Sequence, residues 1–200
     1  MPIKLATKAE AANIARTLAD AFSVDPIFNW FMRADHKRDA ARYGMFTAVV
    51  KLLGFDECEI KILENADGVA VWIPFPGEMK PPIHKEVKAF PALFNASGFK
   101  RFARMAKMRN IIKRYKEKSP HAYLWFLGVK PELQGNGLGG KLLDACLKEI
   151  DEQGYVAALE TATLSNVSFY KSRGFEIVHE FQIDETAPKV WTMRREIVSK

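Results

Sequence analysis

The sequence predicts an α/β protein with a mixed, twisted central β-sheet of about six to seven strands and helices on both faces. Residues 123–129 form an aromatic and aliphatic run that is typical of a strand buried on both faces. A glycine-rich turn, an apolar helix and a second strand at 156–161 follow, and this order implies a parallel crossover. The last two predicted strands, 175–183 and 190–198, form an antiparallel pair, so the sheet is mixed.

Apolar periodicity and capping signals predict one short strand, three helices and a β-hairpin in the first part of the chain. These elements are the strand 3–6, the helices 11–22, 27–32 and 36–53, and the hairpin strands 57–64 and 69–73. Thr7 and Glu10 form a capping box ahead of the first helix. Gly54 is expected to end the third helix.

Composition limits the class of protein. The 200 residues are 48% apolar and 27% charged, which is ordinary for a single globular domain spanning 1–200. The two cysteines, Cys58 and Cys146, lie far apart, which argues against a disulfide scaffold and against a zinc site, so we expect no metal. Because there is no signal-peptide core and no apolar run of about 18 residues, we expect a soluble, cytoplasmic protein without a membrane partner.

The segment 83–118 is predicted to be a mostly helical, basic embellishment of this domain. Between Lys100 and Lys118, nine Lys or Arg residues stand against one Glu, a local charge of +8; the chain carries +6, so the rest carries about −2 (+6 less +8). Apolar residues recur at helical spacing, which favours a surface helix with a solvated basic face. Recruitment of an acidic partner is the alternative. We expect no nucleic-acid partner.

Residues 127–140, LGVKPELQGNGLGG, make the most specific physical demand in the chain. Glycines at 135, 137, 139 and 140 remove side chains from the turn, so main-chain N–H groups can close on a bulky anion. The start of the following helix adds unpaired N–H groups and the positive end of its dipole. This combination binds phosphate, and a pyrophosphate fits it best.

Two interpretations of this turn compete. Gly135, Gly137 and Gly140 have the G-x-G-x-x-G spacing of dinucleotide-binding folds, and Glu160 lies where such folds keep a ribose-binding acid. However, five residues separate the strand from the first glycine, and only 40 residues follow Glu160, too few for the rest of a doubly wound domain. A P-loop is excluded because no Gly-Lys-Ser or Gly-Lys-Thr follows the turn.

The second interpretation takes Gln134-x-x-Gly137-x-Gly139 as the unit. In this respect the chain resembles the GNAT-type N-acetyltransferase superfamily, whose acyl-coenzyme A signature is Gln or Arg, two residues, Gly, one residue, and Gly or Ala. The resemblance covers about residues 121–181, from HAYLWFLGV before the turn to LETATLSNVSFYKSRGFE after it. The segments AFSVDPIFNWF, VAVWIPFPG and PKVWTMRR are similar to the branch that includes puromycin N-acetyltransferase.

The resemblance implies an acyl-CoA N-acyltransferase fold that binds acetyl-coenzyme A (acetyl-CoA) as co-substrate. Main-chain N–H groups of the turn would bind the pyrophosphate, and the pantetheine arm would lie between the 127–129 strand end and the 156–161 strand. The Leu127 N–H would polarise the acyl carbonyl. The implied binding residues are Leu127, Gly128, Val129, Gln134, Gly135, Asn136, Gly137, Leu138, Gly139, Gly140, Asn166 and Tyr170. Three basic residues would either contact the 3′-phosphate of the coenzyme or be solvated at the surface: Lys141, Lys171 and Arg173.

Acyl transfer from a thioester to an amine needs a proton acceptor for the amine and a proton donor for the departing thiolate. By resemblance, Tyr170 would point at the sulfur as general acid, and a phenol with a pKa near 10 suits that role; a ring packed in the core is the alternative. Glu160 ends its strand beside the expected acceptor pocket, so it is either the general base or a charged strand end. His121 could titrate near neutral pH, but a loop histidine without a role is favoured. Asp25 would either attract a cationic acceptor or cap a helix.

Four aromatic residues would line the acceptor pocket if they converge, although core packing is the alternative for each and is favoured for Trp125: Trp30, Phe31, Trp72 and Trp125. We therefore expect an N-acetyltransferase that moves an acetyl group from acetyl-CoA to a primary amine of a small molecule in a direct ternary complex. The alternative is a non-catalytic acyl-CoA sensor, or a protein that recruits a partner through the basic helix 100–118. The C-terminal strands could also pair two subunits into a homodimer.

Overall fold

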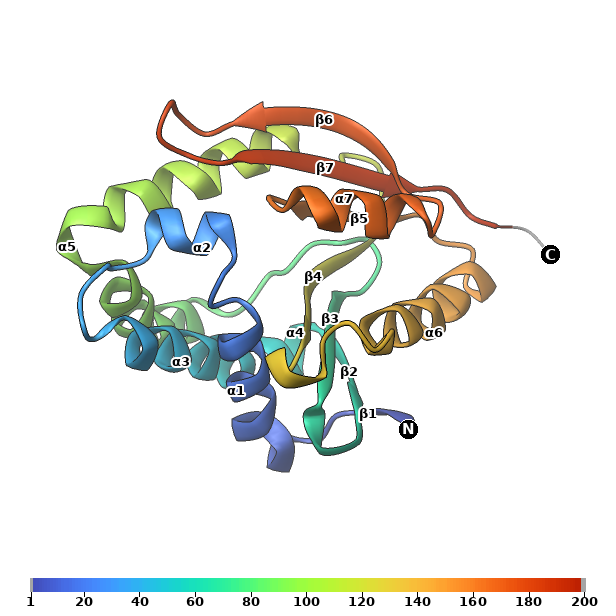
Figure 1. Cartoon of the computed structure of the whole chain (residues 1–200), viewed down its shortest axis with the longest axis horizontal. Helices are drawn as coiled ribbons and strands as arrows, with labels where there is room; N and C mark the ends of the chain where they lie inside the picture. The colour runs from blue at the N-terminus through green and yellow to red at the C-terminus, as the bar shows by residue number, and fades with distance from the viewer. Residues whose placement is uncertain (1, 199–200) are drawn as a thin grey trace.

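Figure 1 shows the computed structural model of the chain, which describes residues 2–198. At its centre is a seven-stranded sheet in the order β1-β2-β3-β4-β5-β7-β6. The strands are β1 (Ile3–Leu5), β2 (Glu59–Leu63), β3 (Gly68–Ile73), β4 (Ala122–Val129), β5 (Ala157–Thr161), β6 (Glu176–Gln182) and β7 (Lys189–Arg195). The β4–β5 pair is parallel and the other five pairs are antiparallel, so the predicted mixed sheet and its parallel crossover are confirmed.

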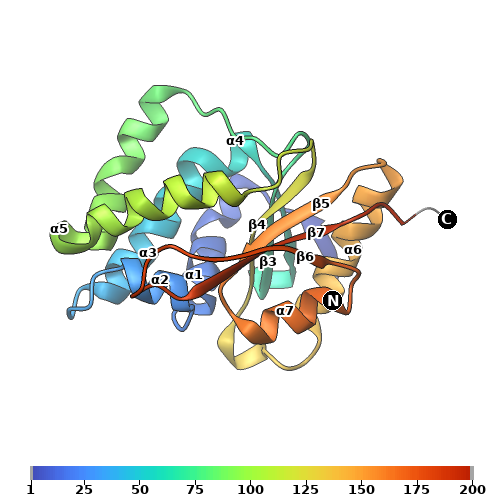
Figure 2. The ribbon, with the colours of Figure 1, turned by 90° about the horizontal axis from the view of Figure 1, so that it is seen from above.

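Helices cover both faces of this sheet (Figures 1 and 2). They are α1 (Ala11–Ala21), α2 (Pro26–Phe31), α3 (Arg38–Ala48), α4 (Phe55–Glu57), α5 (Ile83–Tyr115), α6 (Leu138–Glu152) and α7 (Leu164–Lys171). On one face α1 packs on β3 and β4 with α3 behind it, and on the other α6 and α7 pack on the central strands. No helix within residues 2–198 is long and apolar enough to cross a membrane.

The core lies in two layers because side chains of β3 alternate between the faces of the sheet. Val69 and Val71 pack with apolar residues of α1 such as Ile14, whereas Ala70 and Trp72 pack with those of α6. Both sets are buried. This explains why β3 is an uninterrupted apolar run, and it fixes which face of the sheet each helix covers.

The third predicted helix does not end at Gly54. After α3 the chain continues through a π-helical segment, 49–54, into α4, which ends at Glu57. Gly54 has helical torsions (φ −62°, ψ −53°), and a Cβ added to it would lie 3.2 Å from Ile60 Cδ1. The glycine therefore allows close packing against β2 and does not terminate the helix.

The predicted helical embellishment is α5, which Gly98 (φ 65°, ψ 167°) divides into two arms that fold back on each other (Figure 2). Several basic residues of its second arm bind within the protein. Arg101 Nη1 donates to the Met32 carbonyl at 2.6 Å, and Arg104 Nη1 donates to the Trp30 carbonyl at 2.9 Å. Part of the +8 charge therefore holds α2 against α5 and is not free for a partner.

Candidate functional site

The sheet splits between its two parallel strands. β4 and β5 pair only from Ala122–Leu124 to Ala157–Leu159. Beyond that point β4 stays with β3, and β5 stays with β7 as far as Thr161. The β4 register also shifts: Val71 pairs with Phe126 and Trp72 with Leu124, so the residue between them, Trp125, has no partner on β3. Such a bulge bends a strand and redirects side chains, and two cavities lie at this opening.

The first cavity, of about 530 Å³, is the coenzyme-side cavity. It is lined by the glycine turn, the end of β4, the start of α7 and the link between α1 and α2. All the predicted coenzyme-binding residues line it except Gly128 and Asn136. Gly128 is buried against α1, where a Cβ would lie 3.0 Å from Ala21 Cβ. The Asn136 side chain donates to the Leu133 carbonyl at 3.1 Å.

The turn itself needs glycine at two positions. Gly135 (φ 80°) and Gly137 (φ 74°) adopt left-handed torsions, which other residues reach only with strain. A Cβ at either position would meet no atom within 4 Å, so the turn faces open space. Gly137 caps α6 without a side chain, and the Gln134 side chain fastens the turn by donating to the Val129 carbonyl at 3.0 Å. The first N–H groups of α6 are thus left bare, as an anion requires.

Of the three basic residues near this turn, Arg173 is already engaged. Its Nε donates to Asp144 Oδ1 at 2.7 Å, and its guanidinium lies against Gly140. Lys141 and Lys171 are exposed and do not line the cavity. None of the three basic side chains therefore lines the coenzyme-side cavity.

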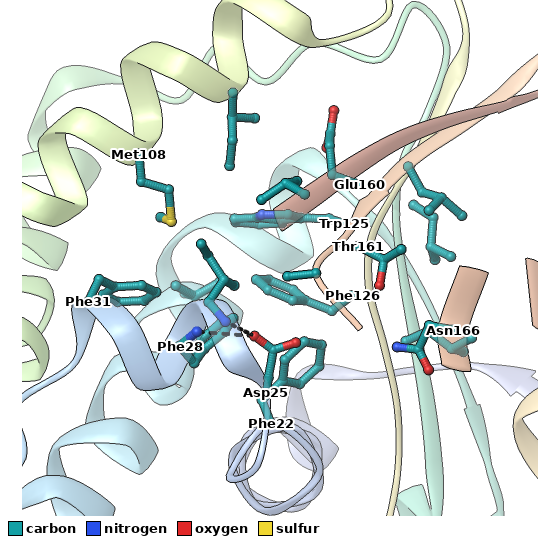
Figure 3. Close-up of a pocket in the computed structure, with 18 of the residues that line it drawn as sticks. Phe22, Asp25, Phe28, Phe31, Met108, Trp125, Phe126, Glu160, Thr161 and Asn166 are labelled. Carbon is teal, nitrogen blue, oxygen red and sulfur yellow. Dashed lines mark hydrogen bonds between the residues drawn. The ribbon is translucent and has the colours of Figure 1, made fainter. Parts of the chain in front are cut away.

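The second cavity, of about 270 Å³, is the acceptor-side cavity (Figure 3). Residues of α2, α3, the π-helical segment 49–54, α5, β4, β5, α7 and β7 line it, and most are apolar. Of the four aromatic residues expected here, Phe31 and Trp125 line the cavity, whereas Trp30 and Trp72 do not. Trp72 points to the α6 face of the sheet, and the Trp30 indole donates to Thr186 Oγ1 at 2.9 Å. The expected convergence was therefore wrong for these two: Trp72 packs in the core layer against α6, and Trp30 packs in the same layer as Phe31 without lining the cavity.

The two cavities meet at a junction. Five residues line both: Phe22, Asp25, Leu127, Asn166 and Tyr170. Two of these, Asp25 and Tyr170, are titratable. The junction thus combines the predicted acyl-polarising residue Leu127 with a phenol and a carboxylate.

Tyr170 is buried, with 7% of its surface exposed, and its ring contacts Phe169 and Phe175 edge to face. Burial and the nearby Asp25 carboxylate raise the pKa of Tyr170 above its usual range. Its hydroxyl therefore keeps its proton near neutral pH and can act as a donor at the junction.

Glu160 projects from β5 into the acceptor-side cavity. Its Oε2 accepts a short hydrogen bond from the Tyr123 hydroxyl, and its buried Oε1 has no hydrogen-bond partner within residues 2–198. Burial raises the pKa of the Glu160 carboxyl to about 7, although the Tyr123 hydroxyl and the Lys116 ammonium group lower it. A carboxyl that titrates near neutral pH can take up and release a proton during turnover.

Sequence reasoning missed the residues that surround Glu160. The Lys116 Nζ lies 4.2 Å from the centroid of the Tyr123 ring and donates to the Gly77 carbonyl at 2.6 Å. Alternation along β4 could have placed Tyr123 on the same face as Trp125, but nothing local to Lys116 indicates its position. His121 lies outside both cavities, buried against Gly77, and burial lowers its pKa. No group of three or more His, Cys, Asp or Glu side chains in the described part of the chain could hold a metal ion.

Asp25 has one of the two roles that its sequence context allowed, that of a helix cap. Its Oδ1 accepts from the backbone N–H groups of Ile27 (2.9 Å) and Phe28 (3.1 Å) and caps α2, as the dashed lines of Figure 3 show. The side chain also lines the junction. Burial raises the pKa of Asp25, while the two N–H groups oppose that rise.

The chain is similar to known acetyltransferases in sequence and in fold. A family model described as the acetyltransferase (GNAT) family matches residues 98–175. A Corynebacterium glutamicum structure described as histone acetyltransferase HPA2 and related acetyltransferase superposes with a TM-score of 0.75 at 19% identity, covering 99% of this chain and 97% of that chain. Arylalkylamine N-acetyltransferase 2 from Aedes aegypti gives 0.61 at 15% identity, covering 98% and 99%. Drosophila melanogaster polyamine N-acetyltransferase gives 0.58 at 16% identity, also covering 98% and 99%.

These similarities confirm the predicted acyltransferase fold over the whole chain. They do not confirm the closer resemblance to the branch that includes puromycin N-acetyltransferase, which stays a prediction. Residues 98–175 thus match the GNAT acetyltransferase family, and the chain as a whole has the fold of that family's solved members.

Proposed function

We propose that this protein transfers an acetyl group from acetyl-CoA to a primary amine of a small molecule, with both substrates bound together. The single observation that carries this proposal is the junction, where the cavity that the glycine turn lines and the apolar cavity share five lining residues. Two cavities that share a wall allow direct transfer between two bound molecules. Residues 1–200 would act as one domain, with α5 as a wall of the acceptor side.

The coenzyme-side cavity fits acetyl-CoA because its turn presents bare N–H groups to a pyrophosphate. The residues that would hold it are those of the turn, with Leu127, Val129 and Asn166 along the pantetheine arm. Acetyl-CoA supplies the activated acetyl group as a thioester. The Leu127 N–H would donate a hydrogen bond to the acyl oxygen, a contact that strengthens as charge develops there.

Proton movements can be assigned to two side chains. The bond between the amine nitrogen and the acyl carbon forms while the carbon–sulfur bond breaks. Glu160, directly or through a water, would accept the proton that the amine loses, and Tyr170 would give its proton to the departing sulfur. The pKa of Glu160, about 7, suits a group that must be ionised before transfer and protonated after it.

The structural neighbours support an amine acceptor. The Aedes aegypti protein is named for arylalkylamines, and the Drosophila melanogaster protein is described as catalysing the formation of N-acetylagmatine. Both are amines of small molecules. At 15% and 16% identity, these proteins bear on the reaction class and leave the acceptor of this protein to be measured.

The test is acceptor-dependent release of free thiol from acetyl-CoA with a panel of primary amines, combined with calorimetry of coenzyme A binding. We expect binding of coenzyme A and thiol release that rises with amine concentration. Binding without amine-dependent release would support the alternative, a non-catalytic acyl-CoA sensor. Absence of coenzyme A binding at millimolar concentration would contradict both.

A further inference from the structure

We propose that the acceptor is a primary monoamine carried on a flat, apolar body, and that Asp25 binds its ammonium group before Glu160 removes one proton and the neutral amine attacks. The proton that the nitrogen loses after attack replaces the one that Tyr170 gives to the sulfur. This inference rests on the proposed acetyl transfer and adds the class of acceptor. The evidence for it is the position of the carboxylates and of the aromatic side chains that line the acceptor-side cavity.

The cavity has a polar side and an apolar side. Figure 3 shows Asn166 and Thr161 on the side of β5 and α7, and Phe31 and Met108 on the opposite side. Asp25 lies at the junction with the coenzyme-side cavity, which is where the reacting nitrogen must arrive. An acceptor that reacts there extends its remaining atoms toward α2 and α5.

The side toward α2 and α5 has the shape and chemistry of a site for a ring. Phe28 stacks on Phe46 at 5.5 Å between centroids, and Trp125 stacks on Phe126 at 4.7 Å. The Met108 thioether points into the same space in Figure 3. Thioethers and aromatic edges favour a flat apolar partner, and a cavity of about 270 Å³ admits a molecule with one or two rings.

Asp25 supplies the charge that an ammonium group needs. Its Oδ1 takes both capping hydrogen bonds, so its Oδ2 is left for a ligand. A helix cap does not require a charge, because Asn caps about as well as Asp. Burial disfavours the ionised carboxylate and raises the pKa of Asp25. A bound cation at Oδ2 compensates that penalty, which explains a carboxylate at this buried junction.

The same distribution disfavours diamines and polyamines. Asp25 and Glu160 are the two acidic residues that line the cavity, and no acidic residue lines the side that Phe31 and Met108 form. The free energy cost of burying a second, unpaired ammonium group there is large. In the proposed transfer Glu160 accepts the proton of the reacting amine, so the same carboxylate is not available to a distal ammonium group, although its Oε1 has no hydrogen-bond partner within residues 2–198.

The first experiment compares 2-phenylethylamine with 1,4-diaminobutane in the thiol-release assay. We expect kcat/KM to be about tenfold or more higher for 2-phenylethylamine. In Asp25→Asn, which keeps the helix cap, KM for 2-phenylethylamine should rise about tenfold while the Kd of coenzyme A and the melting temperature change little. Asp39→Asn removes the same charge from the exposed surface of α3 and serves as the matched control.

The second experiment moves the charge. Met108→Glu places a carboxylate on the apolar side, and Met108→Gln is the uncharged control of the same size. The ratio of kcat/KM for the diamine over the monoamine should rise about tenfold in the Glu variant alone.

Preference of the wild type for the diamine, or an unchanged KM in Asp25→Asn, overturns the acceptor class while acetyl transfer stands. If no primary amine in the panel causes thiol release, the proposed function is overturned, and the acceptor class with it.

Discussion

The two cavities that meet at Tyr170 are built in different ways. In the coenzyme-side cavity the proposed pyrophosphate site comes from one continuous stretch, residues 133–140, and would use backbone N–H groups. The acceptor-side cavity draws side chains from eight helices and strands. Backbone recognition demands glycine at fixed spacing and so leaves a pattern in the sequence. Recognition by side chains from separate elements leaves no such pattern.

This difference predicts which substitutions act on one side and which act on both. The Tyr170 hydroxyl, at the junction, should affect transfer without weakening either binding step. A change in the turn should weaken coenzyme binding alone, and a change at or around Glu160 should alter the pH dependence of transfer.

Tyr170→Phe tests the junction and should have the largest effect. If the hydroxyl protonates the departing sulfur, kcat should fall by about 10²–10³ while the Kd of coenzyme A stays within about twofold. Single-turnover kinetics and calorimetry measure the two quantities. Tyr155→Phe, on a ring that stacks on Phe75 outside both cavities, is the control. An unchanged kcat would refute the assignment of Tyr170 as general acid.

Glu160→Gln removes the proposed proton acceptor and keeps an acceptor oxygen for the Tyr123 hydroxyl. We expect kcat/KM at pH 8 to fall by about 10². In the wild type, activity should rise with pH through about 7, because Glu160 must be ionised to act and its pKa is about 7. That rise should disappear in the variant. A pH profile that kept its midpoint near 7 would assign the proton acceptor to another group.

Gly137→Val tests the backbone side. A β-branched residue at φ 74° is strained, at about 1–3 kcal/mol, and the turn must change its torsions to relieve it. We expect the Kd of coenzyme A to rise about tenfold or more. Gly154→Val introduces the same side chain at the same φ of 74°, in open space beyond the end of α6. Calorimetry should show that Gly154→Val keeps its affinity for coenzyme A. An equal loss of affinity in both variants would mean that the turn has no binding role.

Glu160 should also make stability depend on pH. Its folded pKa of about 7 lies above its ordinary value of 4.5, so the folded chain holds this proton more tightly than the unfolded chain. The free energy of unfolding should therefore decrease as the pH rises from about 4.5 to 7, and this decrease should be absent in Glu160→Gln. Above pH 7 the variant should be more stable by about 1–3 kcal/mol, which urea unfolding at pH 5 and pH 8 can measure. A variant that is less stable at pH 8 would contradict this.

Lys116→Met should have the smallest effect and refines the acceptor side. The ammonium group lowers the pKa of Glu160, so its loss should raise that pKa and move the acidic limb of the pH profile upward. Activity at pH 7 should fall by about twofold to threefold and recover at pH 8.5. Lys113→Met, an exposed residue on the same arm of α5, is the control. A limb that stays in place would mean that Lys116 has only a structural role.

The fold and the coenzyme side followed from the sequence because both depend on local order. The crossover from β4 through α6 to β5 is set by consecutive apolar runs, and the turn is set by Gly135 and Gly137, whose torsions exclude other residues. The helix that continued past Gly54 shows the limit of such reasoning, since a glycine that allows packing and a glycine that ends a helix look alike in sequence.

Tertiary structure alone decided the acceptor side. Trp30 packs in the same core layer as Phe31, and Trp72 packs in the opposite layer, yet neither lines the cavity that Phe31 and Trp125 line. The environment of Glu160 depends on Tyr123, one strand away, and on Lys116 at the end of a bent helix. Burial and charge act through space, so residues far apart in the chain fix the pKa of Glu160, and no local pattern records their distance.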